Sequence, residues 1–253
     1  MRRAFSVTAT ALLVFLLAVP ANPQTAQAGA QNTPQALKAT YDQAMLAKDW
    51  PAAVAAAQQL VDANATSANL YLLGNAQLYA TTGKQDTGPE EATLATYDRA
   101  LAAAEREKPA PSQPDQAQPD QAWKDGVAKI YVGRGNALLK LKRTPDAIDN
   151  YNRAAALSST PGKALFNICA VLYNTGDMEN GPAACRKAAA ADPTNANAWF
   201  VLGSLLFANA PIDSNRKVAI AEEGSTALKK YLEIAPGGPH AADVKAMLDM
   251  CAK

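Results

Sequence analysis

Two cysteines, Cys169 and Cys185, flank the segment NTGDM, and a thiol pair can serve as a redox couple, a metal site or a structural disulfide. The pair does not form a C-x-x-C motif, which is the usual arrangement in thiol redox proteins. The chain has 3 cysteines and 1 histidine, too few ligands for a zinc site. We therefore expect no metal and no cofactor. A disulfide and two buried free thiols both stay open, and Cys251 is left over in either case.

Other residue types that support catalysis are scattered along the chain. His240, in the segment GGPHAADV, is expected to be a surface residue in the first turn of the last helix. Two pairs of adjacent carboxylates, Glu90 with Glu91 and Glu222 with Glu223, lie on predicted helices. Adjacent helical residues point in different directions, so solvated helix faces explain both pairs.

Motifs for nucleophiles and phosphates do not appear in the sequence. It contains neither a G-x-S-x-G elbow nor a G-x-x-x-x-G-K loop. The segment GRGNAL, which begins at Gly133, lacks the third glycine of a dinucleotide-binding loop and lies inside a helical pattern. We interpret this glycine as a helix-packing residue. The sequence therefore predicts no catalytic residues and a protein that is not an enzyme.

The composition favours helices. Hydrophobic residues make up 49% of the chain and aromatic residues only 6%, and the surplus is alanine. Alanine costs little in a helix and lets two helices approach closely. An all-α protein is the expected class.

A period of 34 residues runs through the second half of the chain. It relates three series of positions: Tyr131, Leu165 and Trp199; Gly135, Cys169 and Gly203; and Leu138, Leu172 and Leu206. In each unit these residues form an apolar stripe on a first helix, and a second helix carries a stripe such as Ala147, Tyr151 and Ala154. The segments TPG, DPTN and APGGP separate the units.

These units resemble the tetratricopeptide repeat family. The segments WFVLGSLL from Trp199, GNALLKLKRTPDAIDNYNRA from Gly135 and AAADP before Thr194 match the family pattern well. The resemblance implies an all-α, right-handed α-solenoid of antiparallel helix pairs with a C-terminal capping helix. We place five units at about 34–67, 68–107, 127–161, 162–195 and 196–236, with the cap at 237–253.

A helical hairpin in the fourth unit bears on the two cysteines. Cys169 and Cys185 each lie eight residues from Asp177, in the turn, so antiparallel helices place them level on inward-facing stripes. Helix axes ~8–10 Å apart allow such α-carbons to approach within the ~4.4–6.8 Å that a disulfide spans. This geometry favours a disulfide.

The N-terminus has the pattern of an export signal. Residues 1–28 carry Arg2 and Arg3, a short apolar run and small residues suited to cleavage after Ala21 or Ala28. We expect a periplasmic or extracellular protein with no membrane span after cleavage. Removal of the two arginines changes the formal charge from +1 to −1, which argues against nucleic acid as a partner.

The mature chain is expected to fall into two groups of repeats. Two units occupy 29–107 and three occupy 123–236. Between them, the Pro/Gln-rich segment 108–122 cannot continue a helix. We expect it either to split the solenoid into two lobes or to lie over an unbroken stack.

The family resemblance also implies a binding surface, because first helices of tetratricopeptide units line a concave groove for an extended peptide or a partner helix. The residues that it would present are Lys38, Asp42, Tyr71, Asn75, Tyr79, Lys129, Asn136, Lys140, Lys163, Phe166, Asn167, Asn174, Phe200, Ser204 and Phe207. Asn75, Asn136 and Lys163 match positions of a carboxylate clamp found in some members. Two basic positions of that clamp are Tyr71 and Asn167 here.

Two functions follow from these expectations. The first is a non-enzymatic scaffold or adaptor of the cell envelope that binds a protein or peptide partner in its groove. The alternative is an accessory or sensor subunit of an envelope enzyme that binds glycan or a small ligand. It would require Tyr71, Tyr79, Tyr131 and Trp199 to form an exposed stacking face. Solvated helix residues without a ligand would also fit the groove positions.

Overall fold

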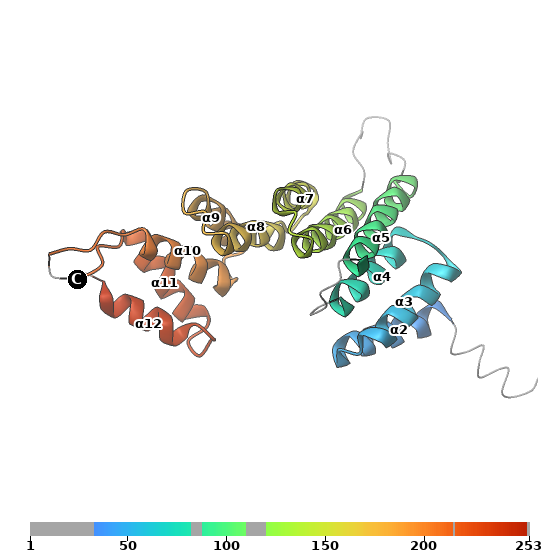
Figure 1. Cartoon of the computed structure of the whole chain (residues 1–253), viewed down its shortest axis with the longest axis horizontal. Helices are drawn as coiled ribbons and strands as arrows, with labels where there is room; N and C mark the ends of the chain where they lie inside the picture. The colour runs from blue at the N-terminus through green and yellow to red at the C-terminus, as the bar shows by residue number, and fades with distance from the viewer. Residues whose placement is uncertain (1–32, 82–87, 110–119, 215, 252–253) are drawn as a thin grey trace, which may run out of the picture.

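The computed structural model describes residues 33–81, 88–109, 120–214 and 216–251. These residues form an elongated row of helices in which consecutive helices pack against each other (Figure 1). The helices are α2 (Pro34–Ala47), α3 (Trp50–Ala63), α4 (Ser67–Ala80), α5 (Gly88–Arg106), α6 (Gln121–Lys140), α7 (Thr144–Leu157), α8 (Gly162–Asn174), α9 (Gly181–Ala191), α10 (Ala196–Ala208), α11 (Glu222–Ile234) and α12 (Ala241–Met250). The predicted export signal lies outside the described residues.

The predicted all-α solenoid is confirmed. Helices α2 to α11 form five successive pairs, and α12 packs on α11 at the end of the row (Figure 1). Within the described residues β-structure is limited to isolated bridges from Val218 to Ile212 and to Cys251. None of the described helices has the length and apolarity needed to cross a membrane.

Side-chain caps explain several of the helix starts. Thr33, Asp49, Thr66 and Asn195 each accept a hydrogen bond from the backbone N–H three residues later, which satisfies a donor that the helix leaves unpaired. Asp120 caps α6 in a similar way. The helix therefore begins at Gln121, earlier than the unit start predicted at 127.

The core continues along the row past the Pro/Gln-rich segment, of which residues 110–119 lie outside the described part. One hydrophobic cluster extends from Tyr41 on α2 to Val171 on α8. Across the segment, the indole Nε1 of Trp123 donates to the carbonyl oxygen of Ala104 at 2.8 Å. Helices α5 and α6 are thus directly packed.

Tyrosines of the second helices pack onto glycines of the first helices. Tyr97 and Tyr151 are both 0% exposed. A Cβ atom at Gly133 would lie 2.5 Å from the Tyr97 ring, and one at Gly135 would lie 2.6 Å from the Tyr151 ring. The interpretation of GRGNAL as a helix-packing segment is therefore confirmed, because only glycine leaves room for these rings.

The predicted disulfide is also confirmed. Cys169 on α8 and Cys185 on α9 are fully buried and bonded, with their Cα atoms 4.7 Å apart. Cys251 has a buried free thiol. Its Sγ atom donates to the carbonyl oxygen of Met247 at 3.1 Å.

Three acidic or basic side chains differ from the sequence-based expectation. Glu90 is 6% exposed, so a solvated face does not explain it. Glu223 is exposed but accepts two hydrogen bonds from Arg186 of α9, at 2.6 and 2.8 Å. His240 is not a simple surface residue, because its ring stacks on Phe200 with centroids 3.9 Å apart. The contacts of Glu223 and His240 join helices that are distant in sequence.

Candidate functional site

Two adjoining cavities lie along the first helices of the N-terminal four pairs, and together we call them the groove. Their volumes are about 330 and 410 Å³. Both are lined by Tyr71 of α4 and Lys129 of α6. The 330 Å³ cavity reaches Lys163 on α8, and the 410 Å³ cavity reaches Lys38 on α2.

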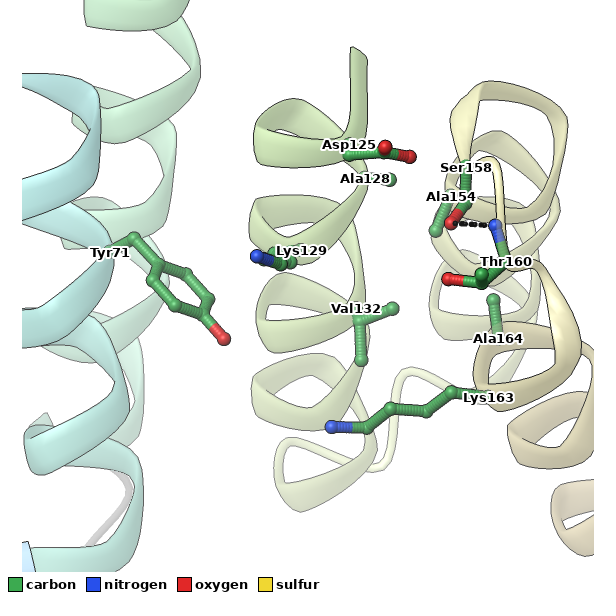
Figure 2. A pocket seen from close by; sticks show the side chains of 10 residues that line it. All are labelled: Tyr71, Asp125, Ala128, Lys129, Val132, Ala154, Ser158, Thr160, Lys163 and Ala164. Atoms are coloured by element: carbon green, nitrogen blue, oxygen red, sulfur yellow. Dashed lines mark hydrogen bonds between the residues drawn. The ribbon is translucent and has the colours of Figure 1, made fainter. Parts of the chain in front are cut away.

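The 330 Å³ cavity has an apolar floor and a polar rim (Figure 2). Its floor is formed by Ala128, Val132, Ala154 and Ala164. The Tyr71 hydroxyl points from α4 toward α6, and the side chain of Lys163 extends from α8 toward α6 (Figure 2). This rim carries hydrogen-bond donors and positive charge over small apolar residues.

A carboxylate at the same rim is already engaged. Asp125 accepts hydrogen bonds from the backbone N–H of Ser159 at 2.7 Å and from its hydroxyl at 2.8 Å. These two bonds hold the pKa of Asp125 below its usual range. Nearby, the backbone N–H of Thr160 donates to the Ser158 hydroxyl at 3.1 Å, the dashed line in Figure 2. The turn between α7 and α8 is thereby fixed at the edge of the cavity.

The 410 Å³ cavity is more apolar. Leu60, Leu72 and Ile130 line it together with Gly126, which contributes no side chain. At its edge Lys38 forms an ion pair with Asp42, with Nζ to Oδ2 at 2.6 Å. This cavity has the size and apolar lining typical of small-ligand and side-chain pockets.

The electrostatic balance of the groove favours anions. Lys129 and Lys163 are exposed, and neither ammonium group is in an ion pair with another described residue. The nearby Asp125 carboxylate accepts hydrogen bonds from Ser159 but keeps its negative charge, so Lys129 and Lys163 leave the 330 Å³ cavity with one net positive charge. The capacity of Asp125 to accept further hydrogen bonds from Lys129 or from a ligand is reduced accordingly.

Four of the predicted groove residues line these cavities: Lys38, Tyr71, Lys129 and Lys163. Asp42 joins them through its ion pair with Lys38. Asn167 is half-buried and Asn174 exposed, and neither lines the groove. The same holds for Phe166 and Phe207, which are both half-buried.

The two predicted clamp asparagines have structural partners. The Tyr97 hydroxyl donates to Oδ1 of Asn75 at 2.9 Å, and the Tyr151 hydroxyl donates to Oδ1 of Asn136 at 2.7 Å. Each bond ties a first helix to the second helix of its own pair. Neither asparagine lines the groove, so the expected clamp geometry is not assembled there.

Other predicted groove residues serve contacts between helices. The ammonium group of Lys140 donates to the carbonyl oxygen of Leu78 and to the hydroxyl of Thr81, and burial lowers the pKa of Lys140. Tyr79 is exposed and stacks on Trp50 with ring centroids 5.2 Å apart. Both residues lie near the C-terminal end of their helices, away from the two cavities.

The prediction was wrong for Phe200 and Ser204. Phe200 is 8% exposed and Ser204 is 6% exposed. Phe200 belongs to the same hydrophobic cluster as Ala241 and Val244 of α12. Phe200 packs on Tyr231 of α11 and on His240 at the start of α12, so later helices cover this part of the face of α10 that the repeat pattern assigned to the groove.

Sequence reasoning missed several groove residues, among them Asp125, Gly126, Ser158 and Thr160. Asp125 and Gly126 precede the predicted start of the third unit at 127. The sequence did offer one signal for Gly126: it is a glycine inside a helix, and no aromatic residue at the repeat spacing accounts for it.

The stacking face required by the alternative function is not assembled. Of its four aromatic residues, Tyr71 lines the groove, whereas Tyr79 stacks on Trp50. Tyr131 is half-buried, with the Arg153 guanidinium 5.9 Å from its ring centroid. The indole Nε1 of Trp199 donates to the carbonyl oxygen of Pro193 at 2.9 Å. Within the described part of the chain, no group of three or more His, Cys, Asp or Glu side chains is placed to hold a metal ion.

Comparisons with known proteins locate the fold. No family model matches the chain, and no curated protein matches it either. Among solved structures, the MamA protein is 17% identical with a TM-score of 0.51, over 85% of this chain and 96% of that one. YrrB, described as a tetratricopeptide-repeat protein with an unusual peptide-binding site, is 16% identical with a TM-score of 0.50, over 88% and 97%. TTC0263, a thermophilic tetratricopeptide-repeat protein of Thermus thermophilus, is 15% identical with a TM-score of 0.51, over 86% and 97%.

Proposed function

We propose that this chain, whose fold is that of the tetratricopeptide-repeat proteins, is a non-enzymatic scaffold that binds an extended, acidic peptide segment of a partner protein in its groove. The observation that carries the proposal is the pair of adjoining cavities that share Tyr71 and Lys129. Two cavities that share lining residues across consecutive first helices suit an extended chain better than a compact ligand.

The chemistry of the groove supports an acidic segment. Lys129 and Lys163 place two exposed ammonium groups at the 330 Å³ cavity, while Asp125 is held by Ser159. An Asp or Glu side chain of the ligand would form charge-assisted hydrogen bonds with these lysines. Peptide binding by YrrB, a structural neighbour, supports the same class of ligand.

The cell envelope is the proposed location. The sequence of residues 1–28 has the pattern of an export signal. The disulfide between Cys169 and Cys185 supports an oxidising compartment. N-terminal sequencing of the protein from a fractionated host tests this part: a chain beginning after Ala21 or Ala28 in the exported fraction is the expected result.

Selection from a random peptide display library on the immobilised full chain tests the binding function. We expect enriched sequences that contain Asp or Glu, and an affinity that falls as salt screens the charges. The double variant Lys129→Ala/Lys163→Ala should lose at least about tenfold in affinity for the selected peptides, because two charge-assisted contacts are lost.

The matched control is Lys187→Ala/Lys245→Ala, which removes two exposed lysines from α9 and α12, outside the groove. It has the same change in net charge and should leave the affinity unchanged. Equal losses in both double variants would show only a general effect of charge and would reject the groove as the site. A selection that yields no enriched sequence would reject peptide binding itself.

A further inference from the structure

Gly126 is a helix-interior glycine that the packing of the chain does not require. It lies in the second turn of α6, where a Cβ atom would meet nothing within 4 Å. On the same helix, a Cβ atom at Gly133 or Gly135 would collide with a buried tyrosine ring. Glycine weakens a helix relative to alanine. The fold thus explains the other two glycines but not Gly126.

The position of Gly126 in the groove offers another reason for a glycine at this site. It lines the 410 Å³ cavity beside Leu60, Leu72 and Ile130. The open space above it is therefore part of the groove, and any side chain at this position would project into that space. Leu60 and Ile130 are almost fully buried and Leu72 is half-buried, so packing holds the apolar residues that line the cavity with Gly126 in place.

Lys129 links this cavity to the charged one. It lies three residues after Gly126 on α6, and residues at this spacing share a helix face. Lys129 also lines both cavities. A ligand with an apolar side chain over Gly126 would therefore bring a neighbouring carboxylate close to the Lys129 ammonium group.

We infer that Gly126 is a specificity-determining residue of the groove: its missing side chain admits a large apolar side chain of the acidic peptide into the cavity formed with Leu60, Leu72 and Ile130. The inference rests on the proposed function, because it names the peptide residue that the groove selects. It assigns the peptide two adjacent features, an apolar anchor at Gly126 and a carboxylate at Lys129.

The experiment uses the full chain and the peptides recovered in the display selection. Their affinities are measured by fluorescence polarisation for the wild type, Gly126→Ala, Gly126→Leu and Gly237→Ala. The last is a matched control, because a Cβ atom at Gly237 also meets nothing within 4 Å but lies between α11 and α12. Each peptide is paired with a version in which alanine replaces its apolar residue.

We expect affinity to fall about tenfold in Gly126→Ala and further in Gly126→Leu, because added atoms occupy the space of the anchor. Gly126→Ala should at the same time raise the Tm, which separates lost binding from lost folding. Gly237→Ala should bind like the wild type. Each peptide whose apolar residue is replaced by alanine should bind weakly, and its affinities for the wild type and for Gly126→Ala should differ little.

Unchanged affinity in Gly126→Ala, together with a loss in Lys129→Ala/Lys163→Ala, would overturn the inference and leave the proposed function standing. Recovered peptides that lack an apolar residue would overturn it in the same way. A selection without any binders would overturn both.

Discussion

A methyl group added at Gly133 should destabilise the protein, although it replaces glycine in the interior of a helix. A Cβ atom there would lie 2.5 Å from Cε1 of Tyr97 and 2.6 Å from its Cζ and Oη atoms. Tyr97 is fully buried, and a Cβ atom at Gly74 would lie 2.8 Å from the same ring on the side of α4. The ring is held between two glycines and has little room to move aside.

The magnitude follows from two opposing effects. Replacement of a helical glycine by alanine stabilises by ~1 kcal/mol. Overpacking a closed core costs ~1–3 kcal/mol, and displacement of Tyr97 also breaks its hydrogen bond to Asn75, which costs about 1 kcal/mol more. We therefore expect Gly133→Ala to lower the free energy of unfolding by ~1–3 kcal/mol. Each kcal/mol corresponds to a Tm decrease of about 2–4 °C in a chain of this size.

Thermal and urea unfolding, followed by far-UV circular dichroism, measure this effect. Gly126→Ala on the same helix is the matched control, because its methyl group enters open space and should stabilise by ~0.5–1 kcal/mol. Opposite signs for the two variants are the expected result. A Gly133→Ala protein as stable as the wild type would refute the description of Tyr97 as a ring clamped between helices.

Three further predictions concern the disulfide and the titratable groups. Cys169→Ala/Cys185→Ala should lower stability by ~3 kcal/mol, because the disulfide closes a loop with a sequence separation of 16; a urea midpoint insensitive to dithiothreitol would contradict this. Burial raises the pKa of Tyr41 to about 12 and also raises that of Tyr97, so their contribution to stability is complete below the ordinary value of ~10 and is lost as pH rises above it. Absorbance titration should show these phenols ionising together with the loss of helix, not before it. The hydrogen bonds from Ser159 lower the pKa of Asp125, so the contribution of the Asp125 carboxylate to stability is present above pH ~4 and is lost as the pH falls further. Asp125→Asn should therefore make the Tm less dependent on pH in that acid range. A variant with the same pH profile of the Tm as the wild type would contradict this prediction.

Local features of the sequence were enough to predict the class of fold and the disulfide. The 34-residue period and the stripe of Ala147, Tyr151 and Ala154 both act within one helix or between neighbouring helices. Such features decide which face of a helix is apolar. Cys169 and Cys185 belong to the same hairpin, so their pairing followed from the position of the turn.

Which polar residues are exposed to a ligand, in contrast, depends on how separate helix pairs pack together. Asn75 and Asn136 lie on first helices as predicted, but tyrosine hydroxyls of the second helices engage them. Phe200 lies on the expected face of α10, yet Tyr231 of α11 and His240 pack against it. The repeat pattern specifies a helix face relative to its own axis, whereas exposure depends on the neighbouring helices that pack there, which are distant in sequence. The groove therefore results from the joint placement of α4, α6 and α8, which brings Tyr71, Lys129 and Lys163 to one cavity.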